Sequence, residues 1–314
     1  MAAKMKFSFN LLGAPITLDD AKFAPKQDYR CEKCTATVLY NAGSNPERFG
    51  RSVKVEHYFK LKKGFTHEDL CKFNILGQVK IIAKESDKNF IKQLKDGQYE
   101  LRLLLPSEGN SSNQVNAARK ENDHDNDTKN SATTSYVSSG NLNSYLNTAA
   151  AVLKLRAFCE EHSEVENHLT LRFDTISVHW KDFYFEIDHY KRLYRILSKA
   201  TVIYPIAVSG KVKEIKKLES KTKLGTFFWK IDLDVPFEKP DENGTVKKTQ
   251  VSISTSESRL IDQIKGNEDI VIFGKWRAEK VNSQPNQNKE SKVKTWENLP
   301  LKFNLTHQRQ IIKL

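Results

Sequence analysis

Apolar and polar residues alternate through most of the last third of the chain, which predicts β-strands there. The alternating segments are YPIAVSGKVKEIKKL, LGTFFWKIDLDVPFE, TVKKTQVSISTS, NEDIVIFGKWRAEKV and LPLKFNLTHQRQIIKL. The second segment places Trp229, Ile231, Leu233 and Val235 on one face. Gly210 interrupts the first segment, as a strongly bent strand requires. The pattern SRLIDQIKG predicts a short helical connector between the third and fourth strands.

Five strands in this order, with the connector and the glycine, resemble the OB fold over residues 201–314. The resemblance implies a small β-barrel that binds single-stranded nucleic acid.

The first hundred residues predict strand-like segments around a group of cysteines. YRCEKCTATVLYNAGS predicts a knuckle followed by a strand, and RSVKVEHYFKLKK predicts another strand that Gly64 ends. THEDLCKFNILGQVKIIAK has helical periodicity, with Thr66 as its N-cap and Asp69 three residues later. GQYELRLLLP predicts a final strand that ends at Pro106.

The composition changes sharply between residues 107 and 140. This segment is polar and nearly free of large apolar residues, so it predicts a flexible linker. After it, LNSYLNTAAAVLKLRAFCEEH predicts a long helix, HLTLRFDTISVHW and KDFYFEI predict strands, and DHYKRLYRILSKA predicts a second helix. We therefore expect an α+β protein with four parts: a zinc-ribbon-like domain (1–106), a disordered linker (107–140), a helix-rich connecting segment (141–200) and an OB-like β-barrel (201–314).

Cysteines and histidines in the first domain have the spacing of a metal site. Cys31 and Cys34 form a CxxC pair, whose thiolates can reach one ion from a tight turn. His67 and Cys71 are four residues apart on the predicted helix and therefore project from one face. Three sulfurs and one nitrogen make a closed tetrahedral set, so we expect a structural Zn²⁺ ion, as in zinc fingers. The alternative is that the CxxC pair arises by chance.

A second histidine competes for the fourth position. His57 lies in VEHYFK, and a CxxC pair followed by a strand with such an HYF-like signature and then a helix resembles the zinc-binding N-terminal region of CoiA-like competence proteins over residues 28–73. That resemblance implies that the histidine beside the aromatic residues is a ligand. Lys60 stands where a second histidine of the signature would lie. We rank His67 above His57 because its spacing to Cys71 needs no rearrangement.

The charge of the chain favours a polyanionic partner. The formal net charge is +12 and the sequence pI is about 9.3. Lysines or arginines that contact phosphates release condensed counterions, which drives nucleic-acid binding. Basic and aromatic residues on the predicted barrel are the candidate contacts: Lys211, Lys213, Lys216, Lys217, Phe228, Lys230, Lys275, Trp276 and Arg277. Trp229 aligns with core residues, whereas Phe228 and Trp276 fit either a core or a stacking position.

These features predict a cytoplasmic accessory protein that binds single-stranded DNA or RNA, alone or within a larger protein complex, and that is not an enzyme. The main alternative is a metal-dependent nuclease of a DNA-processing or defence system. Its carboxylates and histidine would come from the middle segment: Asp174, His179, Asp182, Glu186 and Asp188. A third possibility is a structural subunit whose basic face meets an acidic protein. A Gly-rich phosphate loop, a long apolar run and a signal peptide are all missing from the sequence, so we expect neither an NTPase nor a membrane protein.

Overall fold

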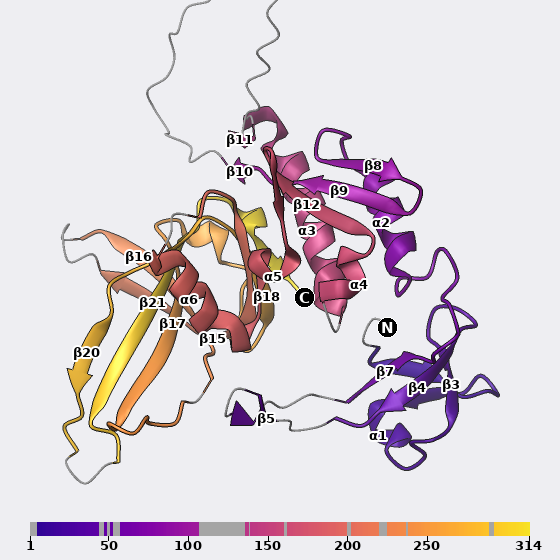
Figure 1. The fold of residues 1–314 in the computed structure, drawn as a ribbon, viewed down its shortest axis with the longest axis horizontal. Coiled ribbons are helices and arrows are strands. Elements are labelled where there is room, and N and C mark those ends of the chain that lie inside the picture. The colour runs from indigo at the N-terminus through magenta and orange to yellow at the C-terminus, as the bar shows by residue number, and fades with distance from the viewer. Residues whose placement is uncertain are drawn as a thin grey trace, which may run out of the picture.

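The chain forms mixed α+β structure dominated by sheets (Figure 1). The computed structural model describes residues 5–43, 47–48, 51–52, 57–106, 136–137, 139–159, 162–199, 202–219, 225–236, 238–288 and 292–314. The N-terminal sheet has the order β2-β1-β3-β4-β7. Its strands are β1 (Phe7–Phe9), β2 (Pro15–Thr17), β3 (Asp28–Cys31), β4 (Thr37–Asn41) and β7 (Tyr58–Leu61), with α1 (Leu18–Ala21) after β2. The short strands β5 (Glu47–Arg48) and β6 (Arg51–Ser52) pair with each other.

A second sheet, with the order β13-β12-β9-β8, lies beside two helices (Figure 1). Its strands are β8 (Ile91–Lys95), β9 (Gln98–Arg102), β12 (Leu169–Phe173) and β13 (Ile176–Val178). The helices are α2 (Ile75–Glu85) and α3 (Leu142–Phe158), and β10 (Leu105–Pro106) pairs with β11 (Tyr136–Val137). The parallel pairing of β9 with β12 joins the predicted zinc-binding domain and the connecting segment in one sheet.

The short helix η1 (Ser139–Asn141) precedes α3, and α4 (His162–Glu166) lies between α3 and β12. The helices α5 (Trp180–Phe183), η2 (Ile187–His189) and α6 (Tyr190–Lys199) link this region to the C-terminal sheet, and β14 (Tyr184–Phe185) follows α5. Among the described residues, no helix is both long and apolar enough to cross a membrane.

The C-terminal sheet is strongly curled and has the main order β19-β21-β17-β16-β15-β18-β22, with β14 on β15 and β20 on β21. Its strands are β15 (Ile206–Glu219), β16 (Phe227–Leu233), β17 (Thr245–Thr255), β18 (Asp269–Gly274), β19 (Trp276–Ala278), β20 (Asn282–Pro285), β21 (Thr295–Asn304) and β22 (Ile311–Lys313), with η3 (Ser258–Leu260) and η4 (Gln308–Gln310) between strands. Only Lys275 separates β18, which pairs with β15, from β19, which pairs with β21. The two ends of the strand order are therefore brought together, and the sheet curls around an apolar interior.

The interior of this curled sheet is a row of directly paired residues. Ile231 pairs with Ile253, Ile253 with Phe303, and Phe303 with Trp276. All four are buried. Successive residues of a strand point to opposite faces, so the residues directly before and after each of these four in its own strand point to the outer face of the sheet.

The long strand β15 belongs to both sides of the curl. Residues 206–211 pair with β18, and residues 212–219 pair with β16, with a register shift between Val212 and Glu214. Gly210 lies at this change of partner, where the Tyr190 hydroxyl of α6 donates to the Ser209 carbonyl at 2.7 Å. A Cβ atom at Gly210 would collide with that hydroxyl. The glycine that the sequence analysis placed at a bend therefore also makes room for α6.

The apolar residues form two clusters. One cluster fills the curled sheet together with Tyr190, Leu193 and Tyr194 of α6. The other spans the N-terminal sheet, the second sheet and α3, and it includes Ala207, Val271, Phe273 and Ile312 of the C-terminal sheet. That side of the curled sheet is therefore fixed to the rest of the protein.

Two sequence expectations need correction. The helix predicted from Thr66 begins at Ile75 instead, with Asn74 as its N-cap, and residues 66–74 form a loop with turns at 69–70 and 72–73. The segment predicted as the strand KDFYFEI forms the short helix α5 followed by the two-residue strand β14, because Trp180 and Phe183 are both buried on one helical turn.

The predicted linker lies outside the described residues over 107–135, and the buried Val137 near its end is in β11. The predicted domain boundaries stay a prediction.

We expect Gly210→Ala to destabilise the protein by about 1–3 kcal/mol, because the new methyl group overpacks the contact with Tyr190. Urea unfolding of the purified variants measures the effect. Gly266→Ala is the matched control, since a Cβ there meets nothing within 4 Å. Adding Tyr190→Phe should recover part of the stability by removing the colliding oxygen. Equal stability of the Gly210 and Gly266 variants would contradict this account.

A buried arginine joins α3, α4 and β14. Arg156 is 1% exposed. Its Nε donates to His162 Nδ1 at 3.1 Å, and its NH1 donates to the Cys159 carbonyl at 3.2 Å. The guanidinium lies 4.7 Å from the centroid of the Tyr184 ring. Glu186 lies 3.9 Å from NH2. Burial and the nearby positive charge of Arg156 lower the pKa of His162 to about 4. The folded state therefore holds this imidazole neutral.

We expect this histidine to make the protein less stable as the pH falls from about 6.5 to about 4. In that range the unfolded chain binds a proton at His162 that the folded chain excludes, so the free energy of unfolding decreases. The decrease should be about 1–2 kcal/mol, since the ring is partly solvated. Urea unfolding at several pH values should show a weaker pH dependence for His162→Asn, which keeps an acceptor but does not titrate. Identical pH dependence in both proteins would contradict the assignment.

Candidate metal centre and nucleic-acid interface

The first two cysteines lie in the turn between β3 and β4. Cys31 ends β3, and its backbone N–H donates to the Ala36 carbonyl at 2.8 Å, which closes the turn. The backbone N–H of Lys33 donates to Cys31 Sγ at 3.4 Å. This turn places Cys34 beside Cys31, as the CxxC spacing predicts.

A loop with two turns, rather than a helix, carries His67 and Cys71. The Cys71 N–H donates to the Glu68 carbonyl and the Asn74 N–H to the Cys71 carbonyl, both at 2.9 Å. The Asn74 side chain donates to the carbonyls of His67 and Glu68 and accepts from the Gly77 N–H, which caps α2. Asn74 therefore ties the start of α2 to the turn that carries His67.

Gly77 allows α2 to begin this close to the turn. A Cβ atom at this position would collide with the Asp69 carbonyl oxygen. The apolar spacing is helical on both sides of Asn74, which is why the sequence predicts a helix through this region.

A carboxylate connects the two halves of the site. Glu68 Oε1 accepts from the Thr35 backbone N–H at 3.0 Å and from its hydroxyl at 2.8 Å. These hydrogen bonds hold the pKa of Glu68 below its usual value. Nothing in the sequence spacing of Thr35 and Glu68 indicates this contact.

The four donor atoms of Cys31, Cys34, His67 and Cys71 lie within 4.8 Å of one another and could bind one metal ion. The Sγ atoms of Cys31 and Cys71 are 3.7 Å apart, and His67 Nδ1 lies 3.3 Å from Cys34 Sγ and 3.6 Å from Cys71 Sγ. A tetrahedral zinc ion with its usual bond lengths sets sulfurs about 3.8 Å apart and sulfur about 3.5 Å from nitrogen. A disulfide needs about 2.05 Å, so the spacing fits shared metal ligation and not a disulfide.

Burial sets the protonation of this site. It raises the pKa of the Cys31 and Cys71 thiols and lowers the pKa of His67. Without an ion the thiols are therefore protonated and the imidazole is neutral. A metal ion would have to displace the thiol protons when it binds.

His57, the alternative ligand, lies outside this cluster. Its ring is 6.2 Å from that of Tyr40, on the side of β4. Within the described part of the chain, the only group of at least three histidine, cysteine or acidic side chains close enough to share an ion is the one that contains His67.

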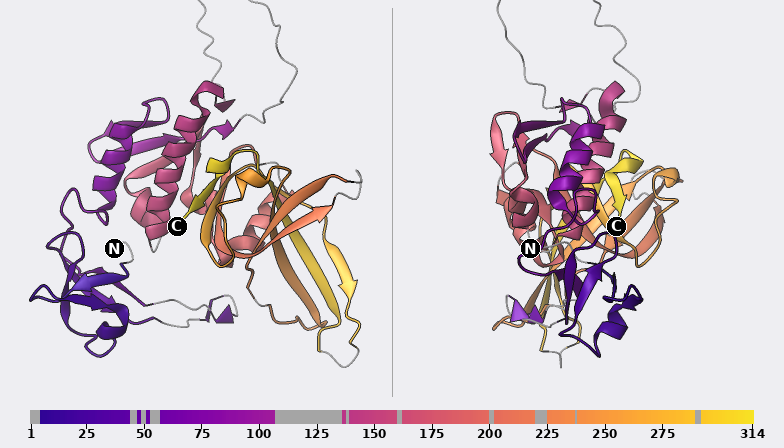
Figure 2. Two further views of the ribbon diagram at one scale, coloured as in Figure 1. Left: turned by 180° about the vertical axis from the view of Figure 1, so that it is seen from behind. Right: turned by 90° about the vertical axis from the view of Figure 1, so that its right-hand side faces the viewer.

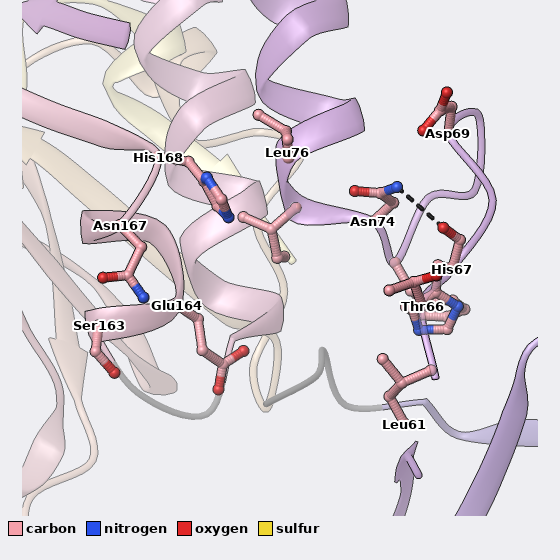
Figure 3. A pocket seen from close by; sticks show the side chains of 12 residues that line it. Leu61, Thr66, His67, Asp69, Asn74, Leu76, Ser163, Glu164, Asn167 and His168 are labelled. Atoms are coloured by element: carbon pink, nitrogen blue, oxygen red, sulfur yellow. Dashed lines mark hydrogen bonds between the residues drawn. The ribbon is translucent and has the colours of Figure 1, made fainter. Parts of the chain in front are cut away.

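A cavity of about 510 Å³ borders the cluster (Figure 3). Polar side chains of α4 and the residues after it, Ser163, Glu164, Asn167 and His168, face Thr66, His67 and Asn74 across it. His67 Nε2 is buried and has no hydrogen-bond partner among the described residues. The ring nitrogen that does not face the sulfurs is therefore available to a water or another acceptor.

The positive charge of the chain is concentrated in its C-terminal part. Residues 201–314 contain 21 lysines and arginines and 14 aspartates and glutamates, which gives +7 of the total net charge of +12. Exposed members of the predicted set are Lys211, Lys213, Lys216, Lys217, Lys275 and Arg277. Lys216 pairs with Glu214 at 2.7 Å, and the half-buried Lys230 pairs with Asp232 at 2.7 Å.

The two aromatic candidates lie in different environments. Trp276 is 4% exposed and belongs to the inner row of the curled sheet, with its ring 5.1 Å from that of Phe303. This is the core position that the sequence left open. Phe228 is half-buried and alternates with Trp229, which packs partly against the interior.

Parallel pairing of β17 with β21 builds an outward row that the sequence analysis missed. Lys230 lies opposite Ser254, and Ser252 lies between Asp232 and Lys302. Lys302 in turn lies opposite Arg277. Lys302 was missed because only the three-dimensional pairing of strands distant in sequence places it beside Arg277.

A groove of about 210 Å³ opens where β16 separates from β17. Lys213, Lys248, Gln250 and Asn298 line it together with the carboxylates Asp232 and Glu214. Two lysines, two amides and two carboxylates therefore meet in this groove.

The carboxylates of the nuclease alternative do not converge within the described part of the chain. Asp182 pairs with Arg192, and Glu186 lies near Arg156. His179 lies 3.4 Å from Glu166. Asp174 occupies the turn between β12 and β13 with φ 53°.

No family model and no curated protein matches the chain. Among solved structures, it is similar to a small single-stranded DNA-binding protein from Streptomyces coelicolor. The identity is 11%, the match covers 31% of this chain and 87% of that one, and the TM-score is 0.19.

We expect protein purified without chelators to contain about one zinc ion per chain. Cys34→Ser and Cys71→Ser should release the metal and unfold the N-terminal sheet, because ligation supplies roughly 10 kcal/mol or more of folding free energy in small zinc domains. Elemental analysis and circular dichroism measure both effects. Cys159→Ser is the matched control, since this buried thiol lies outside the cluster and donates to the Leu155 carbonyl.

The two histidines separate the alternatives for the fourth ligand. His67→Ala should lower the metal content, and His57→Ala should not. A reduced metal content in the His57 variant alone would transfer the ligand role to that residue.

Proposed function

We propose that this chain binds single-stranded nucleic acid through an OB-type barrel formed by its C-terminal sheet. The strand order of the C-terminal sheet is the observation that supports the proposal most strongly. The strands β15, β16 and β17 are the first three, β18 and β19 together make an interrupted fourth strand, and β21 is the fifth. The order around the curl is first, second, third, fifth and fourth, and the third and fifth strands, β17 and β21, are parallel. This is the arrangement of the OB fold, in which a bent first strand pairs with both the second and the fourth.

The outward side of β16, β17 and β21 is the proposed binding face. OB folds hold single strands on the face of their second and third strands, which here are β16 and β17. This face carries Lys230, Lys248 and Lys302, with Arg277 beside it. Lysines of this kind track the phosphate backbone of a single strand.

The Cys/His cluster holds a structural zinc ion in this proposal. Four protein ligands complete a tetrahedron, so no coordination position is left for a reacting water. The donor spacing and the soft thiolate set support zinc over a harder ion. The ion would fix the knuckle of β3 and β4 to the turn before α2.

Binding, rather than catalysis, is the proposed activity. Asp182 and Glu186 of the alternative nuclease centre instead form ion pairs with Arg192 and Arg156. The resemblance to CoiA-like proteins stays a prediction and is not part of this proposal.

Fluorescence anisotropy with labelled single-stranded DNA, duplex DNA and RNA of one length tests the proposal. We expect the full chain to prefer single strands and to bind more weakly as salt rises. The double variant Lys248→Gln/Lys302→Gln should reduce the slope of log K against log salt by about 0.7 for each phosphate that a lysine no longer neutralises. Lys80→Gln/Lys84→Gln on the exposed side of α2 is the matched control and should leave the slope unchanged. Binding that is absent for every strand, or an equal slope in both variants, would refute the proposal.

A further inference from the structure

The hairpin of β15 and β16 extends beyond the curled part of the sheet (Figure 2). Its strand β16 carries two aromatic residues on one side. Phe227 and Trp229 are two residues apart on β16 and therefore share a face. Lys217 pairs directly with Trp229 and lies on the same face. Its Nζ is 4.5 Å from the ring centroid of Phe227 and 5.5 Å from that of Trp229.

Phe227 is 43% exposed, although its ring lies beside the Lys217 ammonium. Ile231, the next residue on this face, is 1% exposed inside the barrel. The face therefore passes from closed core at Ile231, through the half-buried Trp229, to an open ring at Phe227.

We infer that this face, formed by Lys217, Phe227 and Trp229, is a stacking subsite for one unpaired nucleobase. The inference rests on the proposed function and adds to it a site that lies on the opposite face of the hairpin from Phe228 and Lys230. A base covers the exposed part of the Phe227 ring, and the phosphate beside that base meets the Lys217 ammonium.

The chemistry of the face selects this ligand. Aromatic rings carry negative charge on their faces, so a carboxylate of an acidic protein would gain one cation and meet two repelling rings. A nucleobase is planar and uncharged, and it stacks on such rings with little regard to sequence. Bases within a duplex have both faces covered by their neighbours, so the subsite favours single strands.

The test compares an oligo(dT) strand with an abasic strand of equal length, which has the phosphates but no bases. Phe227→Ala should weaken binding of oligo(dT) by about 5- to 100-fold and leave binding of the abasic strand unchanged. Phe227→Tyr should restore oligo(dT) binding, because it keeps the ring. Phe23→Ala is the matched control, since Phe23 is 90% exposed on the N-terminal part of the chain.

Lysine and tryptophan variants report on the same subsite independently. Lys217→Gln should lower the salt slope for both strands by about 0.7. Oligo(dT) should quench tryptophan fluorescence in the native chain, and Trp229→Phe should remove most of that quenching. This second readout needs no change at Phe227 and serves if the alanine variant fails to fold.

The outcomes distinguish this inference from the proposed function. If the native chain binds single strands and Phe227→Ala binds oligo(dT) equally well, the subsite is refuted and the proposed function stands. Equal weakening of oligo(dT) and abasic binding would also refute it, because the effect would then not involve a base. If the native chain binds no strand, both fail.

Discussion

The division of β15 between two partners is the constraint on which the C-terminal half of the protein depends. Its first half pairs with β18 and its second half with β16, so one continuous strand forms a corner of the barrel. The corner needs the register shift near Val212 and a residue without a side chain at Gly210. Tyr190 of α6 occupies the space that the glycine leaves, which seats α6 against the barrel interior.

This corner also determines which side of the barrel is covered. Ala207 and Phe273, on β15 and β18, face the core that includes α3 and α5, and Phe273 contacts the rings of Tyr145 and Phe183. The strands farther along the sheet, β16, β17 and β21, carry lysines and serines on their outer side. One side of the barrel is thus a packing surface, and the proposed binding face lies on the other strands.

The sequence predicted the parts of the fold that depend on local patterns. Alternation identified the strands of the C-terminal sheet, and the CxxC pair with His67 and Cys71 identified the four side chains that lie together. The helical spacing that favoured His67 was wrong, since His67 and Cys71 lie in a loop before α2. Apolar spacing cannot show that Asn74 caps a later helix, because the cap depends on hydrogen bonds to His67 and Glu68.

Long-range pairing explains the remaining differences. Trp276 alternates with basic residues, so its sequence fits an exposed strand, and only its pairing with Phe303 shows that it faces the interior. Lys302 and the Thr35–Glu68 contact were missed for the same reason. In each case the partner is distant in sequence, and no local pattern reports it.

The central claim is that a single strand lies on the barrel and contacts β16, β17 and β21. Ultraviolet crosslinking of the full chain to a single-stranded oligonucleotide, followed by mass spectrometry of the crosslinked peptides, tests it most directly. The account predicts crosslinks concentrated in peptides from residues 225–304. Crosslinks concentrated in the N-terminal sheet or α3 instead would place the nucleic acid elsewhere and contradict it.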